Sequence, residues 1–257
     1  MKITLVQQEI AWGNKAQNLT TFNAIAETHY GKTELLVLPE MFSTGFSVNQ
    51  PHLAETNKGE AIQLVKLWAQ NGNYAVTGSF MVTDGTHTYN RAFFCQPDGT
   101  IDFADKRHLF IGEEEKHFTA GNQHLDITYR GVTFRVLVCY DLRFPVWSRN
   151  VADTLYDVLI YVASWPKDRM DAWDTLLKAR AIENQAYVCG VNAVGTDSYN
   201  IQHNGHSVLL DTRGHTLVDF EDYEKASKTG VINLEKQQRI RTQFPFLKSA
   251  DNFIIKI

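Results

Sequence analysis

Short apolar runs limit the folds open to this chain more than any other feature of its sequence. Leu35–Leu38, Phe134–Val138 and Val158–Val162 are strand-sized and mostly Val, Leu and Ile, with few polar residues between. Runs of this kind indicate strands buried on both faces. Such strands need helices or a second sheet to cover them, so the sequence favours a layered α/β fold.

Amphipathic segments between the apolar runs provide this cover. Helices are predicted over Asn18–Tyr30, Gly59–Trp68 and Asp171–Ala186, the first of them closed by Gly31. Turn residues at 97–99 and 130–131 predict hairpins. This mixed order of β-α-β units and hairpins predicts an α/β protein whose sheets are covered by helices. Further strands are predicted at Ile3–Gln7, Tyr74–Phe80, Tyr89–Gln96, Thr100–Ala104, Leu125–Tyr129, Val188–Val194, Ser207–Leu210 and Thr216–Val218.

Size and composition favour one enzyme-sized domain over residues 1–257. The 257 residues are 44% hydrophobic, and no long linker, run of like charge or repeat divides them. The net charge of −4 and the lack of a basic stripe argue against a nucleic-acid partner. The N-terminus is too polar for a signal peptide, and no run approaches the ~20 apolar residues of a membrane span. We therefore expect no membrane partner and a cytoplasmic location.

Cys139 stands where a buried strand is expected to end. The three cysteines, Cys95, Cys139 and Cys189, are odd in number, widely separated and without a C-x-x-C pair, so neither a disulfide framework nor a zinc ribbon fits. Cys95 and Cys189 lie inside apolar strands, whereas Cys139 is followed at once by Tyr140–Pro145. We expect Phe144 and the residues after it to begin a helix. A thiol at such a corner has a lowered pKa and backbone donors nearby, which suits a nucleophile; a small buried residue is the alternative.

Two charged residues, Glu40 and Lys106, are further candidates for a catalytic role. Glu40 follows the run Leu35–Leu38 and Pro39, so its carboxylate is either exposed or held at the same edge of a sheet as Cys139. Lys106 has aromatic and aliphatic neighbours in sequence, although a lone lysine is usually solvated. Neither segment alone shows whether its charged side chain is exposed to solvent or held near Cys139.

The segments around these three residues together resemble the nitrilase superfamily of carbon–nitrogen hydrolases. Its signature blocks are similar to Leu-Pro-Glu-Met-Phe at Glu40, Asp-Lys-Arg-His-Leu-Phe at Lys106 and Val-Cys-Tyr-Asp-Leu-Arg-Phe-Pro at Cys139. The resemblance covers nearly the whole chain, including 178–185. Within the superfamily, Cys-Tyr-Asp-Leu-Arg-Phe-Pro from Cys139 and Arg-Ala-Ile-Glu-Asn-Gln from Arg180 are most similar to the ω-amidase branch, which hydrolyses short dicarboxylic monoamides such as 2-oxoglutaramate. It implies an α-β-β-α sandwich, a homodimer formed through the helix after the cysteine, and an additional active-site glutamate, for which the interval to Gly121 selects Glu114.

Amide hydrolysis by a thiol accounts for these residue types. The reaction needs a base, donors for the tetrahedral oxyanion and an acid for the departing ammonia. A free thiol of pKa ~8.5 and an exposed carboxyl of ~4.3 are mismatched by about 4 units, or roughly 5.7 kcal/mol. Glu40 is therefore expected to act in a dry pocket beside Glu114, while Lys106 depresses the pKa of Cys139 and binds the oxyanion with the Tyr140 N–H.

The substrate-binding residues are predicted less directly. Arg143 either pairs with Asp141 or binds the distal carboxylate of a substrate, and Trp165 and Phe42 are candidate pocket walls or core residues. No cofactor or metal is expected, since His203 and His206 lack a ligand cluster. Alternatives are a related hydrolase acting on a nitrile, carbamoyl group or other amide, a papain-like hydrolase with an imidazole base, and a non-catalytic binding protein on the same scaffold.

Overall fold

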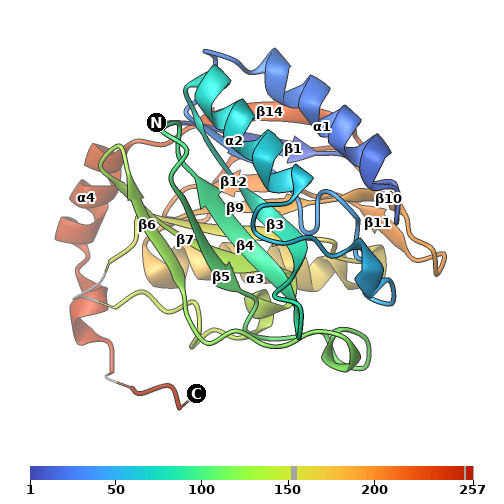
Figure 1. The fold of residues 1–257 in the computed structure, drawn as a ribbon. Helices are drawn as coiled ribbons and strands as arrows, with labels where there is room; N and C mark the ends of the chain where they lie inside the picture. The colour runs from blue at the N-terminus through green and yellow to red at the C-terminus, as the bar shows by residue number, and fades with distance from the viewer. Residues whose placement is uncertain (152–154, 252, 257) are drawn as a thin grey trace.

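Two sheets pack face to face between outer helices in the computed structural model, which describes residues 1–151, 155–251 and 253–256 (Figure 1). In the first sheet the strands follow the order β14-β1-β2-β3-β4-β5. The order in the second is β13-β12-β9-β8-β7-β6, and β10 pairs with β11 in a small separate ladder. Each large sheet has parallel strands at its centre, β1-β2-β3 and β7-β8-β9, with antiparallel neighbours.

The bounds of the elements are as follows. The first sheet comprises β1 (Lys2–Gln7), β2 (Leu35–Val37), β3 (Ala75–Thr83), β4 (Thr88–Cys95), β5 (Ile101–Asp105) and β14 (Ala226–Val231). The second comprises β6 (Leu125–Tyr129), β7 (Val132–Val138), β8 (Val158–Ala163), β9 (Tyr187–Asn192), β12 (Val208–Leu210) and β13 (Thr216–Asp219), and the ladder comprises β10 (Val194–Thr196) and β11 (Gln202–Asn204). The helices are α1 (Lys15–Thr28), α2 (Glu60–Gly72), α3 (Met170–Asn184) and α4 (Leu234–Gln243).

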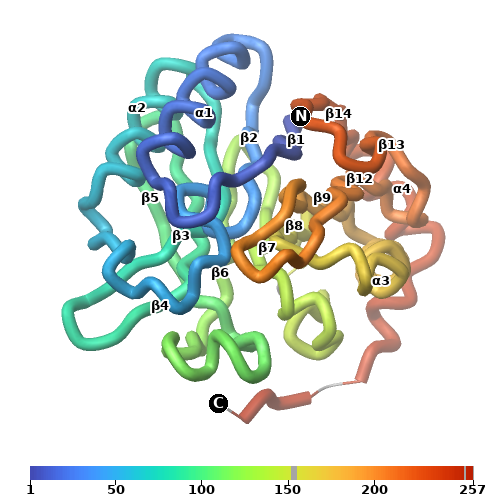
Figure 2. Tube along the Cα trace, turned by 90° about the vertical axis from the view of Figure 1, so that its right-hand side faces the viewer, coloured from blue at the N-terminus to red at the C-terminus, as the bar shows by residue number. Residues whose placement is uncertain are grey.

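Three apolar layers hold these elements together. The central layer joins the two sheets through side chains such as Leu5, Phe94 and Phe134. A second layer lies between the first sheet and α1 and α2, and a third lies between the second sheet and α3. Figure 2 shows α1 and α2 on one outer side and α3 on the other. The order of layers is α-β-β-α, which confirms the fold class, and we propose that this shared core makes residues 1–257 a single domain.

The predicted strands and helices lie within a few residues of those observed, with identifiable exceptions. The predicted strand Val188–Val194 is two strands, β9 and β10, and β11, β14 and α4 were not predicted. The helix expected from Phe144 is wrong: Cys139–Arg143 forms a 3₁₀ turn and Phe144 is extended. Pro145 explains this, because the residue before a proline is disfavoured in the α region. None of the helices in the described ranges combines the length and apolar character that crossing a bilayer requires.

Candidate active site

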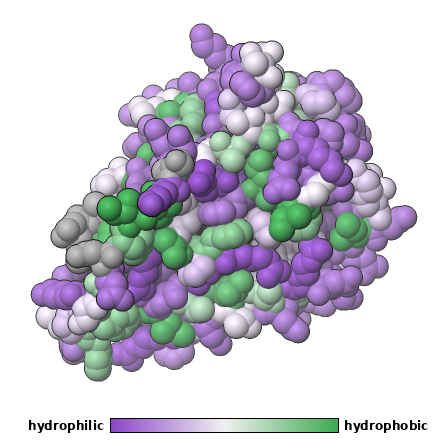
Figure 3. All heavy atoms as spheres, turned by 90° about the horizontal axis from the view of Figure 1, so that it is seen from below, coloured by the Kyte–Doolittle hydropathy of each residue, from purple (hydrophilic) through white to green (hydrophobic). Residues whose placement is uncertain are grey.

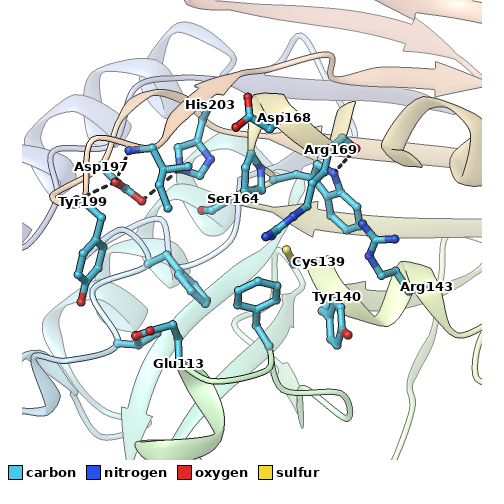
Figure 4. A pocket seen from close by; sticks show the side chains of 16 residues that line it. Glu113, Cys139, Tyr140, Arg143, Ser164, Asp168, Arg169, Asp197, Tyr199 and His203 are labelled. Atoms are coloured by element: carbon cyan, nitrogen blue, oxygen red, sulfur yellow. Dashed lines mark hydrogen bonds and ion pairs between the residues drawn. The ribbon is translucent and has the colours of Figure 1, made fainter. Parts of the chain in front are cut away.

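Glu40 and Cys139 both lie where a parallel strand ends, one in each sheet. Each is accompanied by a residue in the left-handed region, Met41 with φ 46° and Cys139 itself with φ 45°. Non-glycine residues adopt this conformation rarely, and it turns the chain sharply out of the sheet. At Met41 the turn is held by a hydrogen bond of 3.0 Å from the backbone N–H to the Ser79 hydroxyl. Figure 4 shows the sulfur of Cys139 facing a pocket.

The backbone around Lys106 is fixed on both sides. Its N–H donates to the carbonyl of Asn90 at 2.9 Å, and its own carbonyl accepts from the N–H of Gly121 at 2.8 Å. A Cβ on Gly121 would come within 2.1 Å of the Asp105 carbonyl oxygen, so this close approach requires glycine. Lys106 therefore enters the site from a backbone position with little freedom.

A cluster of buried charges lies beside Cys139. The Lys106 ammonium contacts Glu40 Oε1 at 3.0 Å and Glu114 Oε2 at 2.6 Å, and all three side chains are fully inaccessible to water. Asn90 Nδ2 donates to both carboxylates, at 2.8 Å to Glu40 Oε1 and at 2.9 Å to Glu114 Oε1. The cluster thus brings together the three predicted charged residues, and it selects Glu114 from the run 113–115.

Burial and mutual charge set the protonation of this cluster. Burial opposes the charge of Lys106, but the carboxylates of Glu114 and Glu40 outweigh it and raise the pKa of the ammonium above its usual value. Burial raises the pKa of Glu114, and Lys106 counteracts part of this effect. Lys106 is therefore a cation at neutral pH.

The predicted lowering of the Cys139 pKa is wrong. Burial raises the pKa of this thiol well above its ordinary value, and the charge of Glu40 raises it further, whereas Lys106 acts in the opposite direction without prevailing. The short 3₁₀ turn after Cys139 also provides no long helix N-terminus to favour a thiolate. A thiol with a raised pKa is mostly protonated at neutral pH, so any attack by this sulfur would require its proton to leave at the same time.

Asp141 connects the segment of Cys139 to that of Lys106. Its Oδ2 accepts from the N–H of Val138 at 3.1 Å, and its Oδ1 accepts from the backbone N–H of His108 at 3.0 Å. The His108 ring nitrogen Nδ1 lies 2.8 Å from the same oxygen. The predicted pair between Arg143 and Asp141 is therefore wrong, because Asp141 is occupied by the chain on either side of the site.

A second buried contact supports the turn after Cys139. Arg180 of α3 donates to the carbonyl of Leu142 at 2.7 Å and also forms an ion pair with Glu183 at 2.9 Å, one helical turn further along. This side chain is almost completely buried. Helix α3 thus contributes directly to the position of the turn that follows Cys139.

The pocket in front of Cys139 has a volume of about 320 Å³. Three predicted substrate-binding residues, Tyr140, Arg143 and Trp165, line it. Phe42 does not: it is fully buried in the apolar layer beneath α1 and α2, where its ring packs edge-on to Phe22 at 5.5 Å. The prediction of Phe42 as a pocket wall is therefore wrong, because the left-handed turn at Met41 directs the chain back into the core.

Sequence reasoning missed several lining residues. Arg169 extends over the ring of Phe110 with its guanidinium carbon 5.1 Å from the ring centre, while Arg143 lies 4.9 Å from the centre of Trp165 (Figure 4). Neither guanidinium forms an ion pair within the described ranges. Ser164 directly follows β8, so the strand-end criterion that found Glu40 and Cys139 could have found it.

The two histidines of the H-x-x-H motif have different environments. His203 lines the pocket with one ring nitrogen 3.6 Å from Asp197, whereas His206 contacts Asp174 and Asp222. Burial lowers the pKa of His203. Within the part of the chain that the structure describes, no cluster of three or more acidic, histidine or cysteine side chains is placed to hold a metal ion. Cys95 and Cys189 are buried as predicted, and burial raises the pKa of Cys95 to about 12.

Comparisons with known proteins agree with this geometry. Residues 2–242 match the family model described as carbon-nitrogen hydrolase. The ω-amidase YafV of Yersinia enterocolitica is 41% identical, covering 99% of this chain and 98% of the relative; the 2-oxoglutaramate amidase of Bacillus subtilis is 32% identical over 95% of each. The structure of XC1258 from Xanthomonas campestris, a CN-hydrolase superfamily protein with an arsenic adduct in its active site, superposes with a TM-score of 0.97 at 34% identity, covering 100% of this chain and 99% of that one.

Proposed function

This chain belongs to the carbon–nitrogen hydrolase family, and we propose that it is an ω-amidase whose nucleophile is Cys139. Its substrates are short dicarboxylic monoamides of the 2-oxoglutaramate or succinamate type. The names of the relatives from Yersinia and Bacillus point to the same class of reaction. The observation that carries the proposal is a thiol beside a buried ammonium–carboxylate cluster, at a pocket that also contains two guanidinium groups without an ion pair among the described residues.

Each group has a defined part in the reaction. Glu40 accepts the thiol proton as the sulfur of Cys139 attacks the amide carbon, and Lys106 with the Tyr140 N–H stabilises the oxyanion. The carbon–nitrogen bond then breaks, Glu40 returns the proton to the departing nitrogen, and ammonia leaves a thioester. Water adds to the thioester with Glu40 as its base, which releases the carboxylic acid and restores the thiol. Glu114 holds Lys106 in place.

The two guanidinium groups account for selection of a substrate with a distal carboxylate. Arg143 and Arg169 line the same pocket as Cys139, and each lies against an aromatic ring that restricts its movement. A guanidinium binds a carboxylate through two parallel hydrogen bonds. A monoamide with its reacting carbon at Cys139 can therefore place its carboxylate against one or both of these side chains.

A matched pair of substrates tests this assignment. Succinamate and the uncharged butyramide differ at the far end from the amide, so a carboxylate site affects only the first. We expect Arg143→Gln and Arg169→Gln to lower kcat/KM for succinamate by about 10- to 100-fold, the equivalent of one charged hydrogen-bonded contact. Activity on butyramide should stay within about threefold. Equal losses on both substrates, or a parental preference for nitriles, would contradict the proposed substrate class.

The face near the C-terminus supports the expected homodimer. Apolar side chains gather there (Figure 3), and Val146, Phe246 and Phe253 line a shallow depression beside the strongly exposed Ile254. We propose that two copies associate through this face and the adjoining α3, because exposed apolar patches of this kind mark association surfaces. Light scattering coupled to size-exclusion chromatography should report a dimer, and Phe253→Asp with Ile254→Asp should yield a monomer.

The chemistry also suggests where the enzyme works. The reaction needs Cys139 as a free thiol, and none of the three cysteines forms a disulfide. We propose a reducing compartment, the cytoplasm, as its location.

A further inference from the structure

Asn90 contacts all three charged residues of the buried cluster, Glu40, Lys106 and Glu114, and exchanges no proton in the proposed reaction. It lies in the middle of β4 and is fully buried. Its backbone carbonyl accepts the N–H of Lys106, and its side-chain amide donates to Glu40 and to Glu114. The two hydrogens of that amide are thereby assigned to the two carboxylates.

The oxygen of the same side-chain amide, in contrast to its nitrogen, is unsatisfied. Asn90 Oδ1 is buried and has no hydrogen-bond partner among the described residues. Leaving a buried carbonyl unpaired costs stability. The side chain is therefore held for its donors, although a residue selected for stability alone would satisfy both ends.

The two oxygens of the Glu40 carboxylate accept different numbers of hydrogen bonds. Oε1 receives Lys106 at 3.0 Å and Asn90 at 2.8 Å, which fills the two lone-pair positions of a carboxylate oxygen. Oε2 receives only the N–H of Ser164, at 2.8 Å, within the described ranges. One lone pair of Oε2 thus stays available for a proton.

We propose that Asn90 is a positioning residue of the amidase, which holds Glu40 and Glu114 against Lys106 and leaves Glu40 Oε2 as the oxygen that exchanges the proton with Cys139 and with the departing ammonia. A neutral donor suits this position, because it brings two like-charged carboxylates together without adding charge. Without it, the hydrogen bonds that still hold the Glu40 carboxylate within the described ranges are those from Lys106 and from the Ser164 N–H, so the orientation of its two oxygens is less restrained. This inference rests on the proposed amidase reaction.

Substitution of Asn90 tests the proposal directly. Asn90→Ser removes both amide donors and leaves one hydroxyl donor on a shorter side chain. We expect kcat for succinamate to fall about tenfold or more while KM changes less than twofold. The acid limb of the pH–rate profile should move to higher pH, because a carboxylate that has lost a donor is protonated more easily. Asn90→Asp is the isosteric second variant: at lower pH its protonated carboxyl donates one hydrogen bond, so activity relative to Asn90→Ser should rise as the pH falls.

Asn150→Ser is the matched control. Asn150 is equally buried and its Nδ2 also donates twice, to the carbonyls of Tyr156 and Asn184, but it does not line the pocket. The control should lower the melting temperature and keep the parental pH profile. An unchanged acid limb and kcat in both Asn90 variants, measured per folded enzyme, would overturn the proposal.

A substrate-free measurement separates this inference from the proposed function. Iodoacetamide alkylates Cys139 whatever amide the enzyme uses, and the pH dependence of that rate reports the groups around the sulfur. We expect the dependence to change in both Asn90 variants and to be parental in Asn150→Ser. Parental alkylation in every variant refutes the role of Asn90, whereas altered alkylation without turnover of any ω-amide refutes only the proposed substrate class.

Discussion

Removing Lys106 should destabilise the protein more than removing Glu114, although both are members of one buried cluster. Lys106→Met leaves the carboxylates of Glu40 and Glu114 buried together without a cation. Breaking a buried ion pair in this way costs about 3–5 kcal/mol. Glu114→Gln removes a single charged contact, the one of 2.6 Å to Lys106, and leaves the Lys106–Glu40 pair intact. Its expected cost is about 1.5–3 kcal/mol.

These free energies correspond to measurable shifts in melting temperature. For a protein of this size, 1 kcal/mol corresponds to roughly 2–4 °C in melting temperature, so Lys106→Met should melt about 6–20 °C below the parent. The double variant should be less destabilised than the sum of the single variants, since both remove the same contact. Lowering the pH should reduce the cost of Lys106→Met, because burial raises the pKa of Glu114 and this carboxyl then takes up a proton readily.

Urea unfolding under reducing conditions, followed by tryptophan fluorescence, measures these quantities. The free energies of the parent, both single variants and the double variant complete a double-mutant cycle. The slope of the transition should be unchanged, which confirms that all four proteins unfold over the same surface. Equal stability losses for Lys106→Met and Glu114→Gln, or strict additivity in the double variant, would refute the electrostatic reasoning.

Three further outcomes follow from the site. Cys139→Ala should abolish ammonia release and change the melting temperature by less than about 3 °C, since alanine and cysteine incur the same backbone strain; residual turnover would exclude the thiol mechanism. Glu40→Gln should block acylation and thioester hydrolysis, and mass spectrometry showing an acyl-enzyme formed at the parental rate would require another base. Burial lowers the pKa of His203, so its contribution to stability is complete above pH 6.5 and is lost as the pH falls through the lowered value. Parental protein should therefore lose more melting temperature than His203→Gln between pH 7.5 and 5, and parallel losses would contradict this sign.

The sequence predicts the parts of the fold and the site that depend on local pattern. Apolar runs locate the central strands, and the residues that follow these runs include Glu40 and Cys139. The strand β14 escaped detection because it is an edge strand whose side chains are mostly polar or half-exposed. Helix α4 has a low apolar content, so its periodicity is weak.

Contacts between distant segments explain what the sequence could not provide. Phe42 follows a strand as Trp165 does, yet only Trp165 lines the pocket, because the local turn at Met41 decides the direction of the chain. Asn90 is a polar residue within a predicted strand, and nothing nearby in sequence shows that two carboxylates face it. The pKa of Cys139 likewise depends on burial by residues from several elements.

The left-handed backbone at Cys139 implies that the folded protein would be more stable without a side chain at the position of the proposed nucleophile. A φ of 45° costs a residue with a side chain on the order of 1–3 kcal/mol, whereas glycine adopts it freely. A Cys139→Gly variant should therefore be inactive and should have a higher melting temperature than the parent protein. Thermal stability favours glycine at position 139, whereas the proposed reaction requires cysteine there. Substitutions chosen to make the enzyme more heat-resistant should therefore not include this position.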